Sequence, residues 1–210
     1  MGIIGVVAAL TLPNLNSSTG DKEKVAKIKK IYSNLNDAMG RAIAVYGPYS
    51  AWKDGTLPGR LTEFMKISKD CGSTTIQSCF VVTNLKTASD KEDGILNPSS
   101  ATIQESFISA DSTGFIIVKS DNVSYVFIDV DGPNKGAHTI SKDVFGFEID
   151  NNTGEIIPRG QHLLSQGVNY LTCECFNDGN SACTAWVLQY DNMDYLKCPN
   201  KLSDTNTTCK

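Results

Sequence analysis

The chain has 210 residues, of which 40% are hydrophobic and 20% are charged, and its formal net charge is −4. This length can bury one hydrophobic core, and the composition is typical of a folded protein. The mild acidic surplus argues against a protein that binds nucleic acid through its phosphates. We therefore expect a globular protein with no nucleic-acid partner.

The first residues, Gly2–Leu12, carry no charge. As a helix this stretch would be about 17 Å long, too short to cross the roughly 30 Å hydrocarbon core of a membrane. No basic segment precedes it, as one does in a secretory signal peptide. Two interpretations remain: a buried element of the globular core, or the end of a longer membrane helix whose beginning is missing.

A long amphipathic helix is predicted for residues 21–46. Apolar side chains recur there every three or four residues, which is the spacing of one helix face. They are Val25, Ile28, Tyr32, Leu35, Met39, Ala42 and Tyr46. Five lysines between residues 22 and 30 are expected to form a solvated face rather than a surface for anionic lipid or nucleic acid. Gly47-Pro48 ends the pattern, and Pro13 is expected to kink any helix that continues toward the N-terminus.

Alternating apolar and polar residues predict two β-hairpins. Residues 114–119 and 123–130 flank a turn at 120–122, and residues 144–150 and 155–159 flank a turn at 151–154. We further expect a short helix within residues 60–72 whose inward side chains are Leu61, Phe64, Met65 and Ile67. A strand is expected within residues 76–82, and another strand followed by a turn within residues 183–198. A long N-terminal helix packed on an antiparallel sheet makes an α+β fold.

The sequence has seven cysteines, and five of them lie in the last 38 residues; the seven are Cys71, Cys79, Cys173, Cys175, Cys183, Cys198 and Cys209. Structural zinc is disfavoured because paired C-x2-C units are missing from the sequence. Disulfides formed in an oxidising compartment fit better. Short loops favour the pairs Cys71–Cys79 and Cys183–Cys198. Cys209 would then pair with Cys173 or Cys175 and leave one free thiol.

The segment 129–143 has the oxygen-bearing side chains of a calcium site. Asp129, Asp131, Asn134 and Asp143 surround a tight Gly132-Pro133 turn, although their spacing is not that of an EF-hand. The alternative is an ordered turn in which Asp and Asn side chains cap backbone N–H groups. Calcium is the one cofactor that the sequence suggests.

Catalytic motifs are lacking from the sequence. The two histidines, His138 and His162, have no Ser or Cys nucleophile motif around them, and we expect surface or capping roles for both. The sequence has no phosphate-binding loop, dinucleotide-binding motif or H-E-x-x-H. We expect the protein not to be an enzyme, and a secreted hydrolase is the least favoured hypothesis.

The N-terminal region resembles that of type IV pilins and type II secretion pseudopilins. The resemblance lies in "GIIGVVAALTLPNL", the polar linker after it and the lysine-bearing amphipathic helix up to residue 46. The later "VDGPNKG", "KDVFGF" and "CTAWVLQYDNMDYLKC" are more loosely similar to the globular part of such proteins. The family's basic leader, its Gly-Phe or Gly-Met cleavage site and its glutamate near the mature N-terminus are not found here. The resemblance thus implies that Met1 falls partway through the family's membrane segment.

This resemblance implies how the protein would work. Residues 1–20 would be the remnant of an apolar membrane and filament helix, and residues 21–210 a pilin-like globular domain with a disulfide-rich C-terminal region. The protein would be a structural subunit of a type IV pilus or a type II secretion pseudopilus. Its partners would be other pilin-like subunits, bound through the N-terminal helix, and the inner membrane before assembly. The head would be extracytoplasmic, either anchored at the inner membrane or displayed on a cell-surface filament.

A different class of protein is the alternative. An extracytoplasmic adhesin or binding module would hold calcium or a glycan on its head, with Trp52, Trp186 and Tyr190 forming the binding surface.

Overall fold

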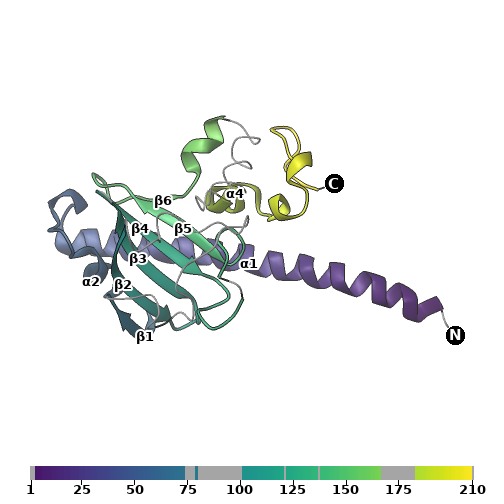
Figure 1. Ribbon diagram of the computed structural model, residues 1–210. Helices are drawn as coiled ribbons and strands as arrows, with labels where there is room; N and C mark the ends of the chain where they lie inside the picture. Colours follow the sequence, from purple (N-terminus) through teal and green to yellow (C-terminus); the bar gives the residue numbers. More distant parts are fainter. Residues whose placement is uncertain are drawn as a thin grey trace.

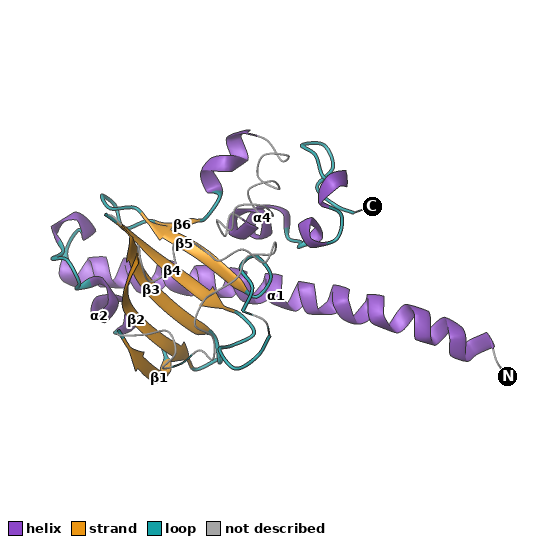
Figure 2. Cartoon of the chain, in the orientation of Figure 1, coloured by secondary structure: helices purple, strands orange, loops and turns teal. Residues whose placement is uncertain are grey.

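The structure is a computed structural model that describes residues 3–73, 79, 101–120, 122–136, 138–166 and 183–209. Figure 1 shows one long N-terminal helix, α1, that lies behind a β-sheet and projects from the globular head toward the N-terminus. Figure 2 shows that the strands form a single layer, with the shorter helical segments at its two ends.

Helix α1 runs from Ile3 to Tyr46, and its 44 residues are about 66 Å long. It passes through Pro13 as one continuous element. The predicted C-terminal end is confirmed: Gly47 has φ +81° and donates its N–H to the Ile43 carbonyl at 2.9 Å, which is a common way for a helix to end.

Only part of α1 is embedded in the head. The predicted apolar face is buried from Val25 onward and includes Ile28, Leu35, Met39 and Ala42. The prediction was wrong for Tyr46, which is 39% exposed and lies beyond the edge of the core. Ile31 and Ala38 are also buried, so the apolar face is wider than the single row of the prediction.

The sheet has six antiparallel strands in the order β1-β2-β3-β4-β5-β6, so each strand pairs with its neighbours in sequence. Their bounds are β1 Ile67–Gly72, β2 Ala101–Ser109, β3 Gly114–Ser120, β4 Val123–Asp129, β5 Val144–Ile149 and β6 Ile156–Pro158. The two predicted hairpins are β3–β4 and β5–β6. The predicted α+β class and the helix-on-sheet arrangement are therefore confirmed.

Both faces of the sheet are covered by apolar side chains. On the α1 side, Phe115, Val126 and Phe147 join the main core, and the Tyr32 ring of α1 stacks on Phe147 at 5.6 Å. On the other side, alternate residues such as Ile116 pack in a second cluster with the Cys71–Cys79 disulfide. The continuous burial of β3 follows from this double coverage.

The remaining helical segments lie at the ends of the sheet. They are η1 Tyr49–Ala51, α2 Leu57–Thr62, η3 Gln161–Gln166, α4 Cys183–Tyr190, η4 Asp194–Leu196 and η5 Pro199–Lys201. The short helix predicted within 60–72 ends earlier than expected, since Ile67 begins β1 and is 36% exposed. The strand predicted within 76–82 lies outside the described residues, apart from Cys79.

The strand predicted within residues 183–198 was wrong, because Cys183–Tyr190 form helix α4. Its first five residues are all buried, and Trp186 is completely enclosed between α1 and the sheet edge. A short run that is buried on every side carries no periodicity to separate a helix from a strand.

Candidate functional site

The head holds α1 through a set of polar contacts at the point where the helix leaves it. We call this set the collar. Its members on α1 are charged side chains in residues 21–30, and each contacts a loop of the head. They are Asp21, Lys24, Lys27, Lys29 and Lys30. The predicted solvated lysine face is confirmed for Lys22, Lys29 and Lys30, which are exposed. It is wrong for Lys24 and Lys27, which are half-buried against the head.

Lys24 is the central collar residue. Its Nζ lies 2.6 Å from Asp131 Oδ2 and 3.1 Å from Asp143 Oδ1, and the Asp143 side chain is only 3% exposed. Burial alone would lower the pKa of Lys24, but its hydrogen bonds and charge interactions with the two aspartates outweigh burial and raise that pKa. The ammonium group is thus held in its charged form between two carboxylates.

Lys27 and Lys30 extend the collar toward the β2–β3 turn. Lys27 donates to the Val130 carbonyl at 2.6 Å, and Lys30 Nζ lies 3.4 Å from Asp111 Oδ2. Burial raises the pKa of Asp111, but the hydroxyls of Ser109 and Thr113 and the two lysines outweigh it and lower the pKa to about 2.

Asp129 is the last residue of β4, at the start of the 130–143 loop, and is almost fully buried. Its carboxylate contacts His138 Nδ1 at 2.5 Å and accepts the backbone N–H groups of Asp131 and Gly132 at 3.1 and 3.0 Å. Burial raises the pKa of Asp129 to about 6, although His138 acts in the opposite direction. The surface role expected for His138 was wrong, since it is buried against this carboxylate. His162, in contrast, is exposed.

The turn is held close to its neighbour by a glycine. Gly132 has φ +88°, and a Cβ atom on it would lie 2.6 Å from the Ser112 carbonyl oxygen. The β2–β3 turn and the 130–143 loop therefore touch through backbone, and a side chain at position 132 would separate them.

Three of the four residues predicted to bind calcium gather at this turn, but the structure gives their carboxylates protein partners. Asp131 and Asp143 face Lys24, Asp129 faces His138, and Asn134 is exposed. Among the described residues no group of three or more His, Cys, Asp or Glu side chains is arranged to hold a metal ion. Calcium at this turn stays a prediction, and an ammonium group already balances two of its carboxylates.

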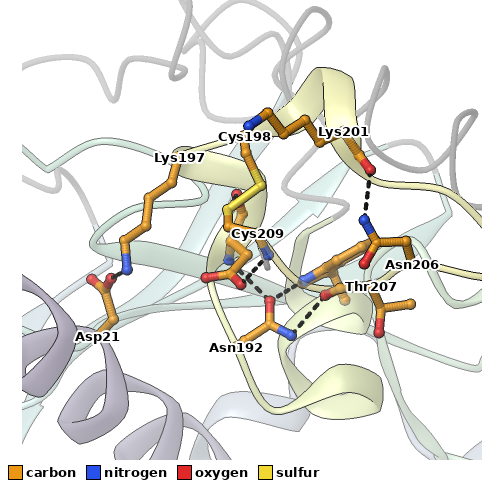
Figure 3. Close-up of a disulfide and its surroundings, with 10 residues drawn as sticks. Asp21, Asn192, Lys197, Cys198, Lys201, Asn206, Thr207 and Cys209 are labelled. Atoms are coloured by element: carbon orange, nitrogen blue, oxygen red, sulfur yellow. Dashed lines mark hydrogen bonds and ion pairs between the residues drawn. A yellow bond between two sulfur atoms is a disulfide. The ribbon is translucent and has the colours of Figure 1, made fainter.

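The opposite side of the collar contacts the C-terminal segment. Lys197 Nζ lies 2.6 Å from Asp21 Oδ2, and Lys29 forms an ion pair with Asp191. Figure 3 shows Lys197 reaching from the segment that carries the Cys198–Cys209 disulfide to Asp21 on the helix. The disulfide-closed segment is thus joined to α1.

The C-terminal segment is also held by its own polar contacts. Asn192 Nδ2 donates to the Thr207 carbonyl at 3.1 Å, and Asp194 accepts the Cys209 N–H at 2.8 Å. The Trp186 indole donates to Asn192 Oδ1 at 2.9 Å. These contacts connect the chain end to helix α4.

The predicted disulfides are confirmed in one case and wrong in the other. Cys71 pairs with Cys79 as expected, with the Cα atoms 5.5 Å apart. Cys198 pairs with Cys209 and not with Cys183, because the segment after η5 folds back on η4 and brings their Cα atoms within 5.7 Å. Cys209 therefore does not pair with Cys173 or Cys175.

The other cysteines are described only in part. Cys183 is in a disulfide as well, and its partner lies outside the described residues. Cys173 and Cys175 lie outside them too.

The predicted aromatic binding surface does not form. Trp186 is fully buried in the core, where its ring contacts Tyr190 and Tyr195. Trp52 follows the C-terminal end of α1 and packs near Tyr46 and Tyr49 instead.

Comparison of the chain with models of known protein families, with curated proteins and with solved structures gave no match. In the part of the chain that the structure describes, no helix is both long and apolar enough to cross a membrane.

Proposed function

We propose that the protein is a pilin-like structural subunit that assembles into a filament through α1 and presents the head on its surface. The observation that carries this proposal is the division of α1 into two parts. Residues from Val25 onward are packed in the head, and the helix continues beyond the head to Ile3 (Figure 1). The apolar sequence Gly2–Leu12 lies at the projecting end.

The collar supports this proposal. A helix that links a head to a filament core needs a firm junction where it enters the head. Here the junction has charged contacts on two sides, with Asp131 and Asp143 on one side and Lys197 on the other. We further propose that the apolar end resides in the inner membrane before assembly and that the head is extracytoplasmic, which suits its disulfides.

Deletion of residues 1–20 tests this function. We expect the full chain to self-associate and the shortened chain to be a folded monomer, because an apolar segment that projects beyond the head would drive association. Analytical ultracentrifugation gives the size of each, and electron microscopy of the full chain shows whether the assemblies are filaments.

Two outcomes would overturn the proposal. One is a full chain that remains monomeric without detergent, and the other is a shortened chain that unfolds in thermal melts because the deleted residues belong to the core. A variant with Leu10, Leu12 and Leu15 changed to serine keeps the full length and controls for chain length.

A further inference from the structure

A small polar cavity lies at the opposite end of the head from the collar. Its volume is about 140 Å³, and it lies between the loop that follows α1 and strands β2, β3 and β4. In Figure 1 this end carries α2 and lies away from the projecting N-terminus. The residues that matter here are Tyr49, Trp52, Gln104, Lys119, Ser124 and Asn151.

Two aromatic rings on one wall are held in place by their surroundings. The Trp52 indole donates to the Gly47 carbonyl at 2.9 Å, and the Arg60 guanidinium lies 4.8 Å from the centre of its ring. The Tyr49 ring packs against Trp52 at 5.1 Å. Gly154 backs Tyr49 so closely that a Cβ atom there would lie 2.8 Å from Tyr49 Cβ. This wall therefore keeps its shape without a ligand.

Gln104 supplies an unused hydrogen-bond acceptor. Its Oε1 atom is buried and has no hydrogen-bond partner among the described residues. A buried carbonyl oxygen without a donor costs about 1–3 kcal/mol of stability. A ligand that brings a hydroxyl or N–H group to this oxygen, with a rotation of the Gln104 side chain toward the cavity that it lines, would remove that cost.

The charges around the cavity disfavour an anion. Lys119 forms an ion pair with Asp54, so its charge is compensated. The Gln104 oxygen would repel the oxygens of a carboxylate or a fully ionised phosphate ester, which only accept hydrogen bonds. Asn151 also lines the cavity, and its side-chain amide is held in place because it donates to the Asn122 carbonyl at 2.7 Å. The lining thus favours an uncharged molecule rich in hydroxyl groups.

We propose that this cavity binds one uncharged sugar residue. Its hydroxyl groups would donate to Gln104 Oε1, and its C–H face would lie against the Tyr49 and Trp52 rings. The volume is below the roughly 300–1,000 Å³ of ordinary ligand pockets, so it suits a single ring at the end of a glycan. This inference concerns the head alone and does not rest on filament assembly.

Saturation-transfer NMR with methyl glycosides of glucose, galactose and N-acetylglucosamine tests the proposal. The full chain is kept in a polyoxyethylene detergent, because alkyl glycoside detergents would themselves present a sugar. We expect at least one glycoside to receive saturation at millimolar concentration, and we expect Gln104→Met to weaken its binding about tenfold.

The Gln104→Met variant separates binding from folding. Because methionine has a similar shape and no unpaired oxygen, we expect its melting temperature to equal or exceed that of the original protein. Gln161→Met, at an exposed glutamine in η3, is the matched control and should bind as the original protein does.

Three results would overturn the proposal. The first is that no glycoside binds at millimolar concentration. The second is binding that Gln104→Met leaves unchanged. The third is binding of inorganic phosphate in preference to the glycosides.

Discussion

At the scale of single residues, the collar shows how charged side chains far apart in sequence form ion pairs in the folded head. Lys24 precedes Asp143 by 119 residues, and Asp143 is nearly buried. The sequence placed Asp131 and Asp143 in one acidic turn, and this much was correct. It did not reveal Lys24 as their partner, because a lysine on an amphipathic helix is most often solvated.

Replacement of Lys24 by methionine should destabilise the head by about 2 kcal/mol. The change leaves the carboxylate of Asp143 buried without its cation. Breaking a fully buried ion pair costs about 3–5 kcal/mol of stability. We expect a smaller cost here because Lys24 is partly exposed to solvent. Urea denaturation measures the effect. Lys22→Met, at an exposed position on the same helix, is the control and should change stability by less than about 0.5 kcal/mol. Equal losses in both variants would show that the ion pairs contribute nothing.

The same variant provides a test for calcium. If Lys24 takes the role of the cation, calcium should raise the melting temperature of Lys24→Met more than that of the original protein, because only the variant has uncompensated carboxylates. Thermal melts with calcium and with a chelator give the comparison. An equal rise in both proteins would instead mean that calcium binds beside Lys24.

Asp111 should give the head part of its acid sensitivity. Its pKa falls from its ordinary value to about 2 on folding, so its contribution to stability is complete above about pH 4. The contribution is lost as the pH falls from about 4 to about 2. Since the side chain is 36% exposed, we expect it to be about 1 kcal/mol. Denaturation of Asp111→Asn at several pH values should show a correspondingly smaller loss, whereas Asp37→Asn should retain the full loss.

At the scale of elements, the sequence predicted strands β3 to β6 because short runs rich in apolar residues flank turn segments rich in Asn and Asp. It missed β1 and β2, which contain polar residues and register shifts, including one between Ile103 and Glu105. Such a shift places consecutive segments of a strand out of phase and hides the alternation. The collar and the cavity were also hidden, since each joins segments that only the folded topology brings together.

The C-terminal segment depends on its own cross-link. Removing the Cys198–Cys209 disulfide by double substitution to serine should lower stability by about 3 kcal/mol, because the unfolded chain gains loop entropy. In this variant, hydrogen exchange should also show that the amides of residues 191–209 lose protection while those of β3 keep it. The Cys71→Ser/Cys79→Ser variant is the comparison and should leave exchange at residues 191–209 unchanged. Unaltered protection after loss of Cys198–Cys209 would show that the polar contacts of Asn192 and Asp194 suffice.

At the scale of the whole molecule, α1 belongs to two environments. From Val25 to Ala42 it contributes core side chains, and toward Ile3 it extends past the head (Figure 1). Hydrogen exchange of the full-length variant with Leu10, Leu12 and Leu15 changed to serine, which we expect to be monomeric, should follow this division. We expect amides from Val25 onward to exchange much more slowly than those before Asp21, because a helix that projects from the head opens easily. Uniform protection along α1 would contradict this division.

The collar also determines how the head would respond to mechanical tension on the projecting helix. A pull along α1 acts first on contacts that lie across the direction of the force, with Asp131 and Asp143 on one flank and Lys197 on the other. These contacts share the force in parallel before it reaches the buried apolar face. Residues 198–209 beside them are closed into a covalent loop by Cys198–Cys209, so this segment cannot be pulled out as an extended chain. Tension on the helix would therefore have to shear the collar as a unit before the sheet opened.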